Sequence, residues 1–339
     1  MITRWVPILF AVAPCFAGEV TVEAKSYFNS FHNRHAVLAR IRTSDHVITR
    51  TVDASGRDRA GKQVAEGSNP LTGPFFVEGA EPGDAIRVTF HKVRLNRNWG
   101  YSAYRLGLFS LTPSSIEQVY PNRFKDNAVI EGRANSVAWD LDLGRKTVKL
   151  REPSSQAQTM EFAAHPMLGC VGVAAAGDFG PSSGISGPYG GNMDYNQVAE
   201  GATVILPVFH PGALLLIGDG HALQADGEPT GTGIETSMDV EFSVQLQKSA
   251  NLGNPRLEND GYIISIGSQP EFASPLDRAL QIATSDMADW LTREYGMEPW
   301  AAHLLIGMQG KYDVITVAGS VGLRIPRSVL PKPAAQPKL

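Results

Sequence analysis

Hydrophobic and polar residues alternate along several segments, the pattern of a strand with one buried face. Residues 84–95 alternate around Ile86, Val88 and Phe90, and residues 236–246 alternate in the same way. We therefore predict a strand in each segment. Shorter alternating or apolar segments predict further strands: one or two within 35–52, then 137–143, 147–150, 203–209 and 213–217.

The hydrophobic period changes towards the C-terminus. Apolar residues recur at helical spacing after Ser274-Pro275, and Gly296 marks the end of the predicted helix. A shorter helix is predicted over about 299–308 and a strand over 312–317, which makes a smaller α/β portion over about 274–325. The tail 331–339 is expected to be disordered. The apolar residues that predict the first helix are Leu276, Leu280, Ile282, Ala283, Met287 and Leu291.

The composition agrees with a mainly β protein. The 339 residues permit one large domain or two intertwined ones, and we expect one domain over residues 18–330. The 34 glycines and 22 prolines, together with the strand-like segments, indicate many turns. The formal net charge is −4 and no run is rich in Lys or Arg, so nucleic acid is not an expected partner.

Residues 1–17 are predicted to be an export signal. Arg4 supplies the positive charge, the apolar stretch from Val6 to Phe16 is too short to span a bilayer, and Ala17 is a small residue suited to cleavage. We therefore expect a periplasmic or secreted protein that does not stay in the membrane after signal removal. The alternative is a buried N-terminal strand. After cleavage Cys170 is the only cysteine, so no disulfide forms within the monomer.

A glycine-rich stretch, residues 165–197, is expected to form loops. It carries few charges, and glycine lets the backbone approach a ligand closely. The small residues around 187–193 predict a narrow pocket for a small substrate.

The segment from Gly218 to Glu228 concentrates polar side chains between two apolar runs. Such a density of ligand-type groups is costly to hold unless a metal ion or a polar substrate lies there. An imidazole with two or three carboxylates suits zinc, and a carboxylate-dominated set also tolerates calcium or manganese. The candidate ligands along the whole chain are Asp53, His165, Asp194, Asp219, His221, Asp226 and Glu228.

Several segments together resemble the acetamidase/formamidase family. They are Asn69 to Asp84 (NPLTGPFFVEGAEPGD), His165 to Ala174 (HPMLGCVGVA), Gly190 to Asp194 (GGNMD), and Pro211 to Glu228 (PGALLLIGDGHALQADGE) followed by Gly231 to Glu235 (GTGIE). The resemblance covers roughly residues 30–330. One departure is Ala174-Ala175, where the family usually has Ala-Pro; export is also less usual for the family.

The resemblance implies a jelly-roll-like β-sandwich with a smaller α/β portion near the C-terminus. It implies hydrolysis of a short amide such as formamide or acetamide to the acid and ammonia. It also implies a divalent metal ion and assembly into a homo-oligomer. The two departures leave the exact substrate open.

Amide hydrolysis needs an activated nucleophile, a stabilised oxyanion and a proton for the leaving amine. Glu228 is the first choice for the base, and Asp226 and His165 complete the predicted catalytic set. The predicted metal ligands are Asp53, Asp194, Asp219 and His221.

Each of these residues also has a purely structural interpretation. Asp219 could cap a turn, His221 could be a hydrogen-bonded core histidine, and Asp226-Gly227-Glu228 is a good hairpin turn. His210 matches no motif and is taken as structural.

Two other hypotheses compete with a metal-dependent amidase. Cys170 could be a thiol nucleophile, although its apolar neighbours favour a buried thiol, and Ser182-Ser183-Gly184 only superficially resembles the serine loop of another amidase family. The second hypothesis is an exported β-sandwich protein without catalysis that binds a polar ligand or a structural calcium ion.

Overall fold

The computed structural model describes residues 18–106, 110–119, 136–152, 159–268 and 275–333. The predicted export signal, residues 1–17, lies outside the described residues, as do residues 334–339 of the predicted tail. Residues 331–333 of that tail are exposed and have no regular structure.

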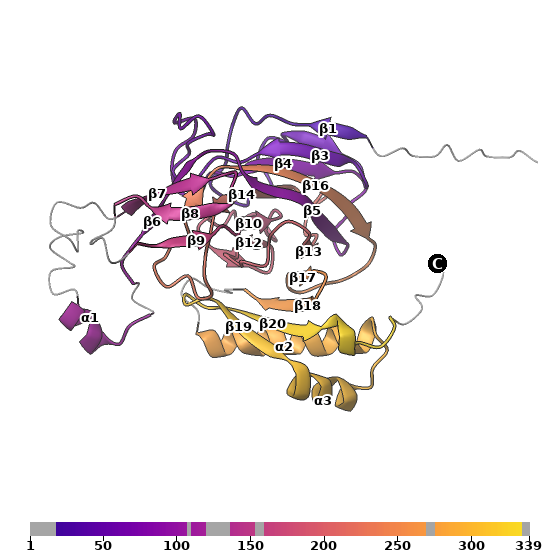
Figure 1. The fold of residues 1–339 in the computed structure, drawn as a ribbon. Coiled ribbons are helices and arrows are strands. Elements are labelled where there is room, and N and C mark those ends of the chain that lie inside the picture. Colours follow the sequence, from indigo (N-terminus) through magenta and orange to yellow (C-terminus); the bar gives the residue numbers. More distant parts are fainter. Residues whose placement is uncertain (1–17, 107–109, 120–135, 153–158, 269–274, 334–339) are drawn as a thin grey trace, which may run out of the picture.

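The described residues form two large sheets, which confirms the predicted mainly β fold (Figure 1). The first sheet has nine strands in the order β1 (Glu19–Thr21), β3 (His46–Arg50), β16 (Met238–Gln247), β5 (Ala85–Leu95), β13 (Thr203–Pro207), β17 (Arg256–Glu258), β18 (Tyr262–Gly267), β20 (Ser320–Pro326) and β19 (Lys311–Thr316).

The second sheet has eleven strands. Its main path runs through β11 (Ser186–Gly187), β12 (Gly190–Asn192), β10 (Met167–Gly172), β14 (Leu215–His221), β15 (Glu235–Thr236), β6 (Trp99–Ala103), β7 (Ser136–Asp142), β8 (Thr147–Leu150) and β9 (Glu161–Ala163). Off this path, β4 (Thr72–Val77) pairs with β14 and with β2 (Ala39–Ile41).

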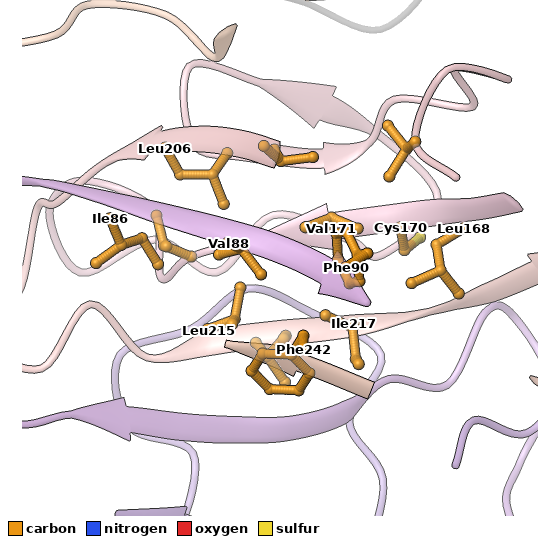
Figure 2. Packing of buried hydrophobic residues seen from close by; sticks show 14 of the residues in the cluster. Ile86, Val88, Phe90, Leu168, Cys170, Val171, Leu206, Leu215, Ile217 and Phe242 are labelled. Carbon is orange, nitrogen blue, oxygen red and sulfur yellow. The ribbon is translucent and has the colours of Figure 1, made fainter. Parts of the chain in front are cut away.

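The main hydrophobic core contains side chains from both sheets (Figure 2). Val88 and Phe90 of β5 lie in this core with Val171 of β10 and Ile217 of β14, and all four are fully buried. The rings of Phe75 on β4 and Phe242 on β16 meet edge to face with centroids 5.2 Å apart. Alternation along β5 and β16 thus points one face of each strand towards the other sheet, as predicted.

The C-terminal part adds helices beside one end of the nine-stranded sheet (Figure 1). Helix α2 (Leu276–Arg293) packs against β18 and β20, and α3 (Pro299–Gln309) packs against α2. Both helices agree with the predicted ones. Leu276 and Leu280 lie exposed at the start of α2, whereas Trp290 supplies a large buried side chain, so the buried face is rotated from the expected one. The chain also has a short helix α1 (Pro113–Val119) and a 3-10 turn η2 (Arg327–Val329).

Two polar or glycine-rich segments are more ordered than expected. The strand predicted over 213–217 continues to His221 as β14, because Gly218 and Gly220 pair with β10. The predicted loop over 165–197 contains β10, β11 and β12. At Gly190 a Cβ atom would lie 2.4 Å from the Val171 carbonyl oxygen, so glycine here allows close strand pairing.

None of the helices in the described part of the chain is both long enough and apolar enough to cross a membrane.

Candidate active site

Five titratable side chains converge where β14, β15 and two loops meet. Asp219 and His221 lie on β14, Glu235 on β15, Asp194 just after β12, and Glu228 in the turn between β14 and β15. His221 Nε2 is 3.5 Å from Asp219 Oδ1 and 3.1 Å from Glu235 Oε1. Ligand atoms of Asp194, Asp219 and His221 lie within 4.8 Å of one another, and so do those of His221, Glu228 and Glu235. The site therefore offers two overlapping sets of metal-ligand type.

The backbone at this site adopts a conformation that most residues avoid. The φ angles of Asp194, Asp219 and Glu228 are 50°, 56° and 42°, in the left-handed region. Such a residue costs on the order of 1–3 kcal/mol and persists only where the surrounding structure enforces it, often at functional sites. Three strained acids in one cluster therefore indicate a site built for its side-chain geometry.

Two glycines clear space for these side chains. A Cβ atom at Gly169 would lie 2.5 Å from Asp194 Oδ1 and 2.7 Å from Asp219 Oδ2. A Cβ atom at Gly233 would lie 2.6 Å from the His221 ring. Neither glycine has a positive φ, so close approach of the ligand-type groups is what requires glycine here.

Replacing Gly233 with Ala is expected to push the His221 ring out of place. The added methyl overpacks a closed site, which costs about 1–3 kcal/mol of stability, and the displaced imidazole should weaken divalent-ion binding. Thermal denaturation and titration with zinc would measure both effects. Gly253→Ala is the control, since a Cβ atom there meets nothing within 4 Å. Unchanged zinc affinity in Gly233→Ala would contradict the expected role.

Four buried atoms of the cluster have no hydrogen-bond partner in the structure. They are Asp194 Oδ1, Asp219 Oδ1, His221 Nε2 and Glu235 Oε2. A buried polar atom left unpaired costs about 1–3 kcal/mol, and more when it is charged. Among the ion pairs of the described residues, none joins these carboxylates to a Lys or Arg. The cluster is therefore deficient in positive charge.

Side-chain amides hold one oxygen of each aspartate in the cluster. Asn69 Nδ2 donates to Asp219 Oδ2 at 3.1 Å, and Asn192 Nδ2 donates to Asp194 Oδ2 at 2.5 Å. One oxygen of each aspartate is thus fixed, and the other, Oδ1, is left for a ligand. In metal sites, residues that hydrogen-bond to the metal ligands in this way hold those ligands in the orientation that binds the ion.

Gln224 determines which nitrogen of His221 can act as a ligand. His221 Nδ1 donates to Gln224 Oε1 at 2.7 Å, and Gln224 Nε2 donates to the Asp194 carbonyl oxygen at 2.6 Å. The second bond fixes the amide orientation, because only the NH₂ group can donate. A neutral His221 therefore carries its proton on Nδ1 and directs the Nε2 lone pair at two carboxylates. That arrangement is repulsive unless a cation lies between them.

Replacing Gln224 with Ala is expected to weaken zinc binding by roughly 10–100-fold, the usual cost of removing a residue that orients a metal ligand. Calorimetric titration measures this independently of activity. Gln224→Glu, which keeps an acceptor for Nδ1, should bind zinc more tightly than Gln224→Ala. Gln245→Ala is the control, since Gln245 is exposed on β16. Equal affinities for all three variants would show that Gln224 does not position His221.

Burial and crowding shift the protonation of the cluster. Burial raises the pKa of Glu228 and of Glu235 to about 8, even though His221 opposes the shift. Burial, with Glu228 and Asp219 nearby, raises the pKa of Asp194 well above its ordinary value. Burial alone lowers the pKa of His221, but Glu235 and Asp219 outweigh it and raise that pKa well above its ordinary value. All these shifts favour bound protons, as expected where a positive charge is missing.

The donor set fits a divalent cation. Orphaned carboxylate oxygens and an imidazole Nε2 with a fixed tautomer are the groups that zinc takes. A carboxylate-dominated set also accommodates calcium or manganese.

Three of the predicted site residues lie elsewhere. Asp53 is fully buried, but its Oδ1 accepts the backbone N–H groups of Ser55 and Arg57, and its Oδ2 pairs with Arg97 at 2.6 Å. Asp226 is exposed and accepts a hydrogen bond from Asn196 at 2.7 Å.

His165 is also exposed, and it lines a separate cavity of about 320 Å³ with Arg94 and Lys146. The structure therefore does not bring Asp53, Asp226 or His165 into the cluster.

The alternative nucleophiles lie in unfavourable surroundings. Cys170 is buried, and burial together with Asp219 and Asp194 raises the pKa of its thiol well above the ordinary value. A thiol in such surroundings stays protonated and is a poor nucleophile. Ser183 is buried and its hydroxyl donates to the Ser68 carbonyl oxygen.

Sequence reasoning missed Glu235, Gln224, Asn69 and Asn192 as site residues. Glu235 ends the GTGIE motif, and a carboxylate within a motif of the family resemblance could have signalled a site residue. The three amides stand within or beside motifs of the family resemblance, but an amide has no distinctive spacing of its own.

Fold and site together define a class: a mainly β protein with a small C-terminal α/β portion and a buried carboxylate–histidine centre. The acetamidase/formamidase family model matches residues 184–310, which include all five clustered residues. The chain resembles that family, and the resemblance expected from its motifs is confirmed.

Individual relatives agree with this resemblance. A putative formamidase of Schizosaccharomyces pombe is 27% identical over 216 residues, 53% of this chain and 52% of that protein. An acetamidase of Mycolicibacterium smegmatis is 28% identical over 221 residues, 52% of this chain and 53% of that protein. The matched part thus spans about half the length of these curated relatives. The crystal structure of an acetamidase from Yersinia enterocolitica is similar over 93% of this chain and 94% of that one, with 27% identity and a TM-score of 0.74.

Proposed function

We propose that this protein hydrolyses the C–N bond of small carboxylic amides and releases the acid and ammonia. The observation that carries the proposal is the convergence of unpaired buried atoms from Asp194, Asp219, His221 and Glu235. The similarity to acetamidases and formamidases supports an amide as the substrate.

The same four residues would hold a divalent cation, with zinc as the first candidate and calcium or manganese as alternatives. A bound divalent ion supplies Lewis acidity, which polarises a carbonyl and makes water more acidic. The chain's own contribution is to exclude bulk water, because all four residues are at most 4% exposed.

Glu228 is placed to move the proton. Unlike the other four residues it is partly exposed, and it lines an open pocket as well as the cluster. A general base works best when its pKa lies near the working pH, because enough of it is then deprotonated and it still binds a proton strongly. The carboxylate of Glu228 would take a proton from water and return it to the leaving nitrogen. Asp226, the other predicted carboxylate, is too exposed and too well paired with Asn196 to share this task.

Ammonia release from formamide and acetamide tests the proposal. We expect release by the zinc-loaded protein, loss of release after chelation, and recovery when zinc, manganese or calcium is returned. Binding of a metal without release of ammonia from any amide would instead support the non-enzymatic binding protein. Activity that survives chelation but is lost in Cys170→Ala would overturn the proposed mechanism in favour of a thiol nucleophile.

We also propose that the protein forms a homo-oligomer, through α3. Trp300, Leu304 and Met308 repeat every fourth residue on this helix and are 64%, 53% and 73% exposed. The neighbouring strand β19 is at the end of the nine-stranded order and exposes Tyr312 and Val314. Large apolar side chains exposed together on one helix face are typical of an interface.

Replacing Leu304 with Glu is expected to shift the protein towards the monomer, because a charge would be buried at the proposed interface. Sedimentation velocity would measure the change. Val37→Glu is the control, since Val37 is 41% exposed and lies far along the chain from α3. An oligomer that is equally stable in both variants would place the interface elsewhere.

A further inference from the structure

We propose that the site binds the apolar substituent of its substrate in a hydrophobic pocket beside Glu228. Primary amides with an acyl group the size of hexanoyl or phenylacetyl would then be better substrates than formamide or acetamide. The inference rests on the proposed function and narrows its substrate class.

The pocket adjoins the candidate site at Glu228, which lines the pocket and also belongs to the cluster. The pocket has a volume of about 580 Å³. Three of its lining residues are neighbours of His221: Gln224 bonds to the ring, Glu228 lies near it, and Gly233 packs against it. An occupant of the pocket would therefore place one end at the proposed base. The pocket is also lined by four apolar side chains of the second sheet and by Met160, just before β9; the four are Val137, Trp139, Leu150 and Phe162.

Several polar groups of the pocket lining are already paired within it. Trp139 Nε1 donates to Ser102 Oγ at 2.9 Å, and Thr232 Oγ1 accepts the backbone N–H of Ala103 at 2.8 Å. None of the unpaired buried side-chain atoms found in the described residues belongs to the pocket lining. The wall therefore selects for an apolar group and offers little to a polar one.

Two side chains of this wall are unusually exposed. Phe162 is 47% exposed and Met160 is 44% exposed, and the Phe162 ring lies 6.3 Å from that of Trp139. Large apolar side chains gathered at a cleft are typical of a ligand site. Continuity with Glu228 indicates that the ligand is the substrate itself.

The size of the pocket argues against acetamide as the best substrate. Pockets of about 300–1,000 Å³ suit ligands much larger than a four-heavy-atom amide. The glycines that predicted a narrow pocket lie instead in the tightly paired strands β11 and β12, so they do not restrict this space. Each methylene buried contributes about 0.8 kcal/mol, or about fourfold in binding.

A substrate series tests the inference. We expect kcat/KM to rise through formamide, acetamide, butyramide and hexanamide, with hexanamide and phenylacetamide exceeding acetamide on the order of 100-fold. Turnover of acetamide with a flat or falling series would overturn this inference and leave the proposed function intact. No turnover of any amide would overturn both.

A variant of the wall provides the second test. Phe162→Ala is expected to lower kcat/KM for hexanamide and phenylacetamide about tenfold and to leave acetamide within about twofold. The matched control is Phe179→Ala, because Phe179 is 70% exposed and is not part of the pocket. If a second copy of the chain occupies the pocket instead, Phe162→Ala will change the oligomeric state and leave the ratio between large and small amides unaltered, which would contradict the inference.

Discussion

Replacing Asp219 with Asn is expected to lower kcat/KM for acetamide by about 1,000-fold or more and to reduce bound metal. Asp219 is 3% exposed, and its unpaired Oδ1 lies 3.5 Å from His221 Nε2, so it belongs to the proposed ligand set. Loss of several kcal/mol of charge stabilisation corresponds to a change of this size, at tenfold per 1.36 kcal/mol. Metal analysis of the purified variant and ammonia release measure the two effects.

Asp226→Asn is the matched control for this experiment. It makes the same chemical change in the same eleven-residue segment, but Asp226 is exposed and contacts Asn196. We expect this variant to keep activity within about twofold, since exposed substitutions of this kind have small effects. If both variants lose activity equally, any change in this segment impairs the enzyme, and a place in the buried cluster is not what matters.

The metal-free protein is expected to be less stable at pH 8 than at pH 5. Burial raises the pKa of Glu235 to about 8 in the folded state, whereas an unfolded glutamate has an ordinary value near 4.3. Between these two pH values the folded state holds more protons, so the free energy of unfolding falls as pH rises. The raised pKa values of Asp194, Glu228 and His221 act in the same direction.

For Glu235 alone the loss is about 4 kcal/mol, which corresponds to a fall in Tm of roughly 10 °C for a chain of this size. Thermal denaturation after chelation, in steps from pH 5 to pH 8, measures it. Zinc added at pH 8 should restore the Tm, because an ion that binds only the folded state stabilises it.

Glu235→Gln is the informative variant for this second prediction, because it removes one titrating carboxyl and should flatten the profile. The carboxylate of Glu258 does not contribute to the loss of stability between pH 5 and pH 8. Ion pairs with Arg87 and Arg327 outweigh burial and lower its pKa, so its contribution is lost only at more acidic pH. If the Tm of the metal-free protein instead rises from pH 5 to pH 8, the pKa values of the clustered groups are not raised and the site does not lack positive charge.

Much of the fold could be predicted because its signals are local. Alternation within 84–95 and 236–246 is the two-residue period of a strand, and β5 and β16 form there with the expected faces buried. The change to helical spacing after Pro275 similarly predicts α2, and α3 follows where expected. A period of two or of 3.6 residues is fixed by backbone geometry, so it can be read without knowledge of distant contacts.

The candidate site could be predicted only in part. Asp219 and His221 stand two residues apart on one strand, and Glu228 and Asp194 stand in motifs of the family, so four of the five clustered residues were candidates from the sequence. Glu235 was not, because its place beside His221 depends on the pairing of β15 with β14.

By itself the sequence determined the mainly β architecture, the family resemblance and the segment from Gly218 to Glu228 as the centre of interest. Only the tertiary structure decided which acids serve the site. Asp226 and Glu228 are two residues apart, yet the turn leaves one in solvent and brings the other to the cluster. Asp53 is as buried as the acids of the cluster, yet Arg97 pairs with it and balances its charge. The physical reason is that a carboxylate's role depends on which charges and donors surround it, and those come from residues far apart in the chain.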